Sequence, residues 1–156
     1  MAVNKTKFSA VYDSFLSKVT DDMYMELTKD ETEGLLQDLL LNAIPYFEFP
    51  RKNIADYSID NEEFNVELDY EEINILATYM AVEWLGQQLA IIDNVRQKYS
   101  GSDFKFTSQA NHMGQVSKLV DQYKTMGFHL QRLYKRREVN EEGEVLSTMS
   151  KIMGGN

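Results

Sequence analysis

The side chains best suited to metal or acid–base chemistry are two histidines and a run of acids. His112 and His129 stand 17 positions apart, so they cannot form the i,i+4 pair that binds zinc on one helix face. Each is expected to be a surface or packing residue. We therefore predict no metal ligand among the histidines.

The acids between residues 60 and 72 invite a calcium-binding interpretation. If an EF-hand loop began at Asp60, Phe64 would replace an oxygen ligand and Asn65 would replace the glycine of the turn. Glu71 would supply the correct type of residue at the last ligand position. Because the other positions fail, solvated acids and helix capping explain this run better than a calcium site.

Catalytic motifs are not found in the rest of the sequence. Asp21 and Asp22 are paired carboxylates, but nothing in the sequence buries or orients them for proton transfer. The phosphate-binding loop, the dinucleotide-binding fingerprint and the nucleophile elbow are absent. The chain also has no cysteine, which excludes thiol catalysis and disulfides. We predict no catalytic residue and no cofactor, and hence a protein that is not an enzyme.

A basic cluster near the C-terminus is the best candidate for a contact site. Its four members fall within six positions: Arg132, Lys135, Arg136 and Arg137. They could face an acidic partner or the phosphates of double-stranded DNA, in contacts that depend on salt and not on base sequence. A solvated helix end explains the same cluster equally well.

Charge is distributed unevenly along the 156 residues, which carry a net charge of -9. Residues 1–72 hold 6 Lys and Arg against 17 Asp and Glu, whereas residues 73–156 hold 10 against 8. This polarity would orient one copy against a neighbour in a repeating assembly. Two solvated faces with a chance imbalance remain the alternative.

The elements that position these residues are expected to be mainly helices. Apolar residues between Phe8 and Val19 recur at offsets that line one helical face, which predicts a first helix from about Ser9. Thr28 and Glu31 have the spacing of a capping box, which predicts the start of a second helix.

Both prolines, Pro45 and Pro50, lie in one short stretch. They should end the second helix before Pro45 and hold an extended connector there.

A long helix is predicted from Asp69 to the region of Gly101. Asp69 and Glu72 have capping-box spacing, and the helix of about 30 residues would be roughly 45 Å long. Its apolar residues cover most of its circumference, which is typical of a helix buried on several sides. We therefore expect some of them to pack between subunits, with Tyr79, Trp84 and Ile91 as candidates. Burial by the helices of the same chain is the alternative.

The C-terminal part is predicted to leave the helical body. A further helix should run from Thr107 to about Gly127, and residues 140–143 resemble a hairpin turn between Val139 and Val145. The expected domains are a helical bundle, residues 1–127, and a C-terminal arm or hairpin and tail, residues 128–156. The predicted fold class is mostly α: a small bundle with one long central helix, an extended proline-containing connector and a C-terminal hairpin or arm.

No signal-peptide core stands at the N-terminus, and no uncharged apolar run of about 18 residues suggests a membrane span. We accordingly expect no membrane partner.

Three segments resemble head–tail connector proteins of tailed bacteriophages, the neck or head-completion adaptors. Residues 71–85 (EEINILATYMAVEWL) are similar to the long helix of that family. Residues 105–111 (KFTSQAN) and 130–137 (LQRLYKRR) carry the rest of the likeness. The resemblance extends over most of residues 9–153 and is one of pattern, without a diagnostic motif. No residue inherits a role from it.

The resemblance implies a virion structural protein, made in the host cytoplasm and located in the neck. About a dozen copies would form a ring beneath the portal protein, lengthen the DNA channel and dock the tail or stopper proteins. Non-specific contact with the packaged double-stranded DNA would be possible, and the acidic half would face the channel. Another tail-completion or assembly protein, or a small non-sequence-specific DNA-binding regulatory module, is the alternative.

Overall fold

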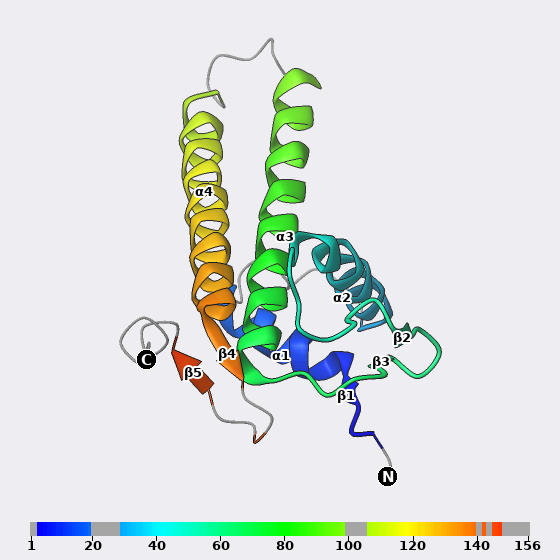
Figure 1. Cartoon of the computed structure of the whole chain (residues 1–156). Coiled ribbons are helices and arrows are strands. Elements are labelled where there is room, and N and C mark those ends of the chain that lie inside the picture. Colours follow the sequence, from blue (N-terminus) through cyan, green and yellow to red (C-terminus); the bar gives the residue numbers. More distant parts are fainter. Residues whose placement is uncertain (1–2, 20–28, 99–105, 140–141, 143–144, 148–156) are drawn as a thin grey trace.

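The computed structural model describes residues 3–19, 29–98, 106–139, 142 and 145–147 and has a mostly α fold. Its helices are α1 (Phe8–Lys18), α2 (Lys29–Ala43), α3 (Tyr70–Lys98) and α4 (Phe106–Arg136). The long helices α3 and α4 stand side by side and run in opposite directions, while α1 and α2 pack around the lower half of α3 (Figure 1). The upper part of the α3–α4 pair extends beyond the other two helices.

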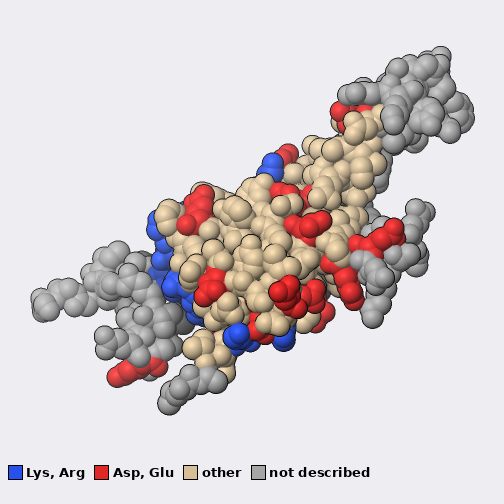
Figure 2. Space-filling view, turned by 90° about the vertical axis from the view of Figure 1, so that its right-hand side faces the viewer, with Lys and Arg blue, Asp and Glu red and all other residues tan. Residues whose placement is uncertain are grey.

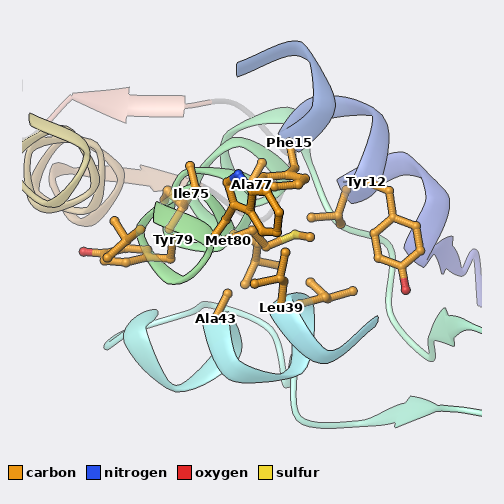
Figure 3. Close-up of a cluster of buried hydrophobic side chains, with 14 of the residues drawn as sticks. Tyr12, Phe15, Leu39, Ala43, Ile75, Ala77, Tyr79 and Met80 are labelled. Carbon is orange, nitrogen blue, oxygen red and sulfur yellow. The ribbon is translucent and has the colours of Figure 1, made fainter. Parts of the chain in front are cut away.

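The hydrophobic core lies between α1, α2 and the first half of α3. Figure 3 shows Phe15 of α1 and Leu39 of α2 directed toward Met80 of α3, with the ring of Tyr12 at the edge of this cluster. All four of these side chains are at most 8% exposed. As predicted, α1 begins near Ser9 and ends before Val19, and its apolar face meets the core.

The exposure of the apolar side chains increases along α3, from its first half to its second half. From Ile75 to Leu85 the apolar side chains are at most 7% exposed. Beyond Leu85, α4 is the neighbouring helix among the residues that the structure describes, and Ile91 is 55% exposed. The first half of α3 is therefore buried by its own chain, whereas the second half keeps apolar surface in contact with solvent.

The predicted capping box at the start of α3 is confirmed. The Asp69 amide donates a hydrogen bond to Glu72 Oε2, and the Glu72 amide donates one to Asp69 Oδ1, both at 2.9 Å. Leu68 is 6% exposed and Ile73 packs against the core beside it, as expected for a hydrophobic staple. The predicted Thr28 cap and the end of the long helix predicted near Gly101 lie outside the described residues.

The prediction that a helix ends near Gly127 is wrong, because α4 continues to Arg136. Gly127 is an interior position at which α4 closely approaches α3. A Cβ atom there would lie 2.8 Å from Tyr79 Cζ, so only glycine admits the tyrosine ring. The domain boundary expected between residues 127 and 128 consequently falls inside a continuous helix.

We expect Gly127→Ala to destabilise the protein by about 1–3 kcal/mol, because the Tyr79 ring must move to make room for the methyl group. Gly114→Ala is the matched control in the same helix, since its Cβ would meet nothing within 4 Å. The control should stabilise the protein by up to about 1 kcal/mol through helix propensity. Urea denaturation of both variants measures the difference, and equal effects would contradict the close contact.

A small antiparallel sheet, not predicted from the sequence, ties the N-terminus to the acidic segment. It consists of β1 (Thr6–Lys7), β2 (Tyr57–Ser58) and β3 (Glu63–Phe64), with β3 in the centre. Lys5 and Lys7 place their Nζ atoms 2.8 and 2.9 Å from the carboxylate of Glu63. These hydrogen bonds hold the pKa of Glu63 below its ordinary value. One acid of the run considered for calcium is thus bound by lysines.

The chain around the two prolines differs from the expected extended connector. Ile44–Tyr46 form one turn of 3-10 helix with Pro45 near its start, where the fixed φ of proline and its missing amide are tolerated. The backbone becomes extended only at Phe47.

After α4, β4 (Arg137–Val139) pairs with β5 (Val145–Ser147) in an antiparallel ribbon. Val139 lies opposite Val145. These are the two residues predicted to flank the hairpin turn.

Candidate interaction surface

The basic cluster occupies the last turns of α4 and the first residue of β4. Arg132, Lys135, Arg136 and Arg137 are all exposed, but the structure does not gather them on one face. Arg132 and Lys135, three positions apart, line the same groove. Arg137 lies elsewhere and forms an ion pair with Glu71 of α3. The cluster predicted from the sequence is therefore two sites with different neighbours.

A buried polar network fixes this end of the molecule. Glu72 of α3 is fully buried and its carboxylate is satisfied on every side. Lys52 Nζ lies 3.0 Å from Oε2, the Tyr134 hydroxyl donates to Oε1 at 2.8 Å, and the Asp69 amide donates to Oε2. A buried carboxylate is tolerated only with such compensation. Glu72 thereby joins α4, the start of α3 and the preceding loop.

Arg51 completes the same junction from the loop after Phe47. Its amide donates to the Tyr134 hydroxyl at 2.9 Å, and its guanidinium lies 3.9 Å from the Tyr134 ring centre. The guanidinium also donates to the carbonyl oxygens of Tyr134, at 2.6 Å, and Arg137. These contacts satisfy carbonyl groups at the C-terminal end of α4, where a cation is favourable. Arg51 thus has a positioning role and is not a free surface cation.

We expect the protein to lose stability above about pH 10, the ordinary pKa of tyrosine. Burial raises the pKa values of Tyr134 and Tyr12, and the Glu72 carboxylate adds to the effect at Tyr134. A group whose pKa is higher in the folded state gives stability that is complete below the unfolded pKa and is lost as pH rises beyond it. Each such tyrosine should lower the free energy of unfolding by about 1.4 kcal/mol per pH unit in that range.

Urea denaturation at neutral pH and at several pH values above about 10 measures this loss. Tyr134→Phe should reduce the slope, since it removes one ionisable hydroxyl. An unchanged slope in that variant would contradict the assignment to Tyr134.

An aromatic and basic groove lies between the loop after Phe47 and the last turns of α4. Its volume is about 240 Å³, and Phe47 and Tyr134 contribute buried rings to its lining. Two phenylalanines are unusually exposed in the same lining, Phe49 at 61% and Phe128 at 58%.

Each of these exposed rings lies beside a positively charged side chain. Lys135 Nζ lies 4.4 Å from the ring centre of Phe49, and Arg132 Cζ lies 5.8 Å from that of Phe128. Both distances fall within the range of cation–π attraction. Exposed aromatic rings beside an arginine are typical of contact surfaces between proteins. We call this feature the aromatic–basic groove.

A second hollow lies on the other side of α4, with a volume of about 200 Å³. Leu130 and Leu133 of α4 line it together with Tyr70, Glu71 and other residues of α3. Tyr70, the first residue of α3, is 83% exposed. A large aromatic side chain is thus held in solvent at the start of a firmly capped helix.

The three residues considered for packing between subunits fall into two groups. Tyr79 and Trp84 are 7% and 5% exposed within the single chain, so they do not present surface to another copy. This differs from the expectation and has a physical reason: the other three helices cover the first half of α3. The Tyr79 ring also stacks on the ring of Tyr46, with 5.2 Å between the ring centres, so one of its faces is already in contact within the chain. Ile91, at 55% exposure, keeps surface for a neighbour.

Of the remaining chemical candidates, Asp21 and Asp22 lie outside the described residues. His129 is exposed, and the side chain of His112 is not among those described. Across the described ranges, no group of three or more His, Asp or Glu side chains could hold a metal ion. Residues 70–94 of α3 are long and apolar enough to cross a membrane by composition, but 56% of that window is buried inside the protein, as in the core helix of a soluble domain.

Comparison with known proteins adds no relative: no family model, no curated protein and no solved structure matches this chain.

Proposed function

We propose that this chain is a head–tail connector subunit of a tailed bacteriophage, a virion protein that forms a ring beneath the portal and joins the DNA-filled head to the tail. The resemblance of residues 71–85, 105–111 and 130–137 to that family supports the proposal. In this role the helices act as a small bundle, and the β4–β5 ribbon acts as an arm toward the tail or stopper proteins.

The observation that carries the proposal is the incomplete burial of the α3–α4 pair. The upper part of the pair extends beyond α1 and α2 (Figure 1), and apolar side chains there remain exposed. Ile91 is 55% exposed on α3, and Leu119 is 39% exposed on α4. We assign this surface to the packing of neighbouring copies in the assembly.

The charge distribution also suits a DNA channel. On the face shown in Figure 2, Asp and Glu side chains are spread widely, while Lys and Arg gather at the left and lower edges. An acidic lining would repel DNA phosphates and let the duplex slide without sticking. We therefore orient the acidic face toward the channel and the basic edge toward protein partners.

The experiment is the mass of the purified protein by light scattering, alone and mixed with portal particles. A connector should join the portal in a fixed ring of about a dozen copies. A stable monomer or dimer that ignores the portal would refute the proposal.

The matched variant reverses the charges of Arg132, Lys135 and Arg136 together. We expect weaker attachment to the portal with the chain still folded, because the lost cation–π contacts and helix-end cations should lower the unfolding free energy by only about 1–3 kcal/mol. Arg137 is left unchanged, because its ion pair with Glu71 belongs to the monomer. Attachment equal to that of the unmodified protein would exclude the basic edge as the portal contact.

A non-specific DNA-binding module is the second candidate, favoured by the exposure of Arg132, Lys135 and Arg136. It predicts binding to duplex DNA of any sequence that weakens steeply as salt increases. A connector whose acidic face lines the channel should bind free duplex only weakly at physiological salt and without sequence preference. Titration of a labelled duplex at several salt concentrations separates the two.

A further inference from the structure

We propose that Tyr70 of one copy docks in the aromatic–basic groove of a second copy of this chain, so that copies associate head to tail. This contact rests on the proposed ring assembly and assigns its two surfaces. The groove has about 240 Å³ of space, which suits one large side chain, and its exposed rings Phe49 and Phe128 lack an apolar cover from their own chain.

Tyr70 has the properties of an anchor residue. Its side chain is 83% exposed, yet its backbone is fixed by the capping box of Asp69 and Glu72 and by the hydrogen bond from the Ile73 amide to the Asp69 carbonyl, at 3.0 Å. Because the backbone is already fixed, docking has to order only the two side-chain torsions of the tyrosine, which costs little conformational entropy. Tyrosines of this kind commonly dominate the energy of protein contacts.

The groove and Tyr70 lie on opposite sides of α4. At about 100° per residue, Phe128, Arg132 and Lys135 project from one side of the helix, and Leu130 and Leu133 project from the other. Tyr70 lines the hollow of Leu130 and Leu133. One copy therefore cannot place Tyr70 in its own groove. A heterologous contact that repeats from copy to copy needs two different surfaces on each copy, and the groove and Tyr70 are two such surfaces.

The charges of the two surfaces are complementary. Three acids flank Tyr70: Glu67, Asp69 and Glu71. Lys52 Nζ lies 3.9 Å from Asp69 and Arg137 pairs with Glu71, so the acids around Tyr70 outnumber the cations by one. Arg132 and Lys135 rim the groove, where Glu48 is the single acid of its described lining. Docking would bring acids of one copy toward cations of the next, and it would place the tyrosine ring where those cations already contact aromatic faces. A second copy is thus the occupant that both shape and charge favour.

Engineered cysteines test this contact directly, because the chain contains none of its own. The variant with both Glu67→Cys, beside Tyr70, and Glu48→Cys, in the groove lining, keeps the contact rings and should form a ladder of covalent multimers on mild oxidation. Each single-cysteine variant can form a covalent dimer at most. A double variant that gives nothing beyond dimers, at a concentration where the unmodified protein self-associates or is bound to portal particles, would overturn the proposal.

A mixing experiment provides the independent readout. Tyr70→Ala keeps its groove, and the double reversal R132E/K135E keeps its tyrosine. Each alone should show at least about tenfold weaker self-association by sedimentation. Mixed together they should form a one-to-one complex that does not grow. Ile59→Ala, an exposed apolar control at 51%, should associate normally. Normal association of Tyr70→Ala would overturn the contact.

The two proposals can fail separately. A cysteine ladder without attachment to portal particles would retain the Tyr70 contact and refute the connector role. Attachment to the portal in a ring without any ladder would retain the connector role and refute this contact.

Discussion

Replacing Glu72 by alanine is expected to destabilise the folded chain by about 2–4 kcal/mol. The substitution removes the acceptor of the Tyr134 hydroxyl, the partner of Lys52 and one half of the capping box in a single step. A buried hydroxyl left without its acceptor costs about 1–3 kcal/mol, and a lost cap costs about 1 kcal/mol more. Urea denaturation of the dilute protein measures the loss.

Glu71→Ala is the matched control at the neighbouring position. Glu71 is partly exposed and forms an ion pair with Arg137, so its removal should cost less than about 1 kcal/mol. If both substitutions cost the same, the network around Glu72 would not be the junction that holds α3 to α4. A Glu72→Gln variant should fall between them, since it keeps an acceptor for Tyr134 and loses the charge facing Lys52.

Local signals in the sequence predicted the helices well because the patterns that mark a helix are local. The capping box of Asp69 and Glu72 involves residues three positions apart, and the structure contains both reciprocal hydrogen bonds. The apolar spacing from Phe8 onward likewise predicted α1 and its buried face. The capping box is stabilised within one turn, whereas α1 shows a local pattern whose stabilising energy comes from packing of its apolar face against the core.

Features that depend on distant residues escaped prediction. Gly127 has the type of residue that often ends a helix, yet its role is set by the ring of Tyr79 on another helix. The strands β1, β2 and β3 are two residues long, too short for any alternation of apolar residues to show. The pairing of β1 with β3 joins residues more than 50 positions apart, such as Thr6 and Phe64, and no local pattern encodes such contacts.

The candidate site was predicted in part. The cluster at the end of α4 was correctly placed on the surface, but its division between Arg132 and Arg137 follows from the continuation of the helix to Arg136. Phe49 and Phe128 were missed because aromatic residues are usually core residues, and only the structure reveals their exposure. The signal available in the sequence was weak: Phe49 stands between Glu48 and Pro50 in a segment that cannot continue a helix.

Replacing Trp84 by alanine is expected to cost about 3–5 kcal/mol of unfolding free energy in the isolated chain. Trp84 is 5% exposed and belongs to the core formed where α1, α2 and α4 surround α3. The loss of so large a side chain leaves a cavity that a close-packed core cannot fill. Denaturation by urea at a concentration too low for assembly measures the effect on the monomer alone.

The control for Trp84 is Ile91→Ala on the same helix, one to two turns further along. Ile91 is 55% exposed, so its truncation should change the unfolding free energy of the monomer by less than about 0.5 kcal/mol. Any effect of that variant should appear instead in the mass of the assembly. The two substitutions therefore separate the part of α3 that stabilises one copy from the part left for a neighbour. A small cost at Trp84 with a large cost at Ile91 would reverse that division and place the enclosed core at the other end of the helix.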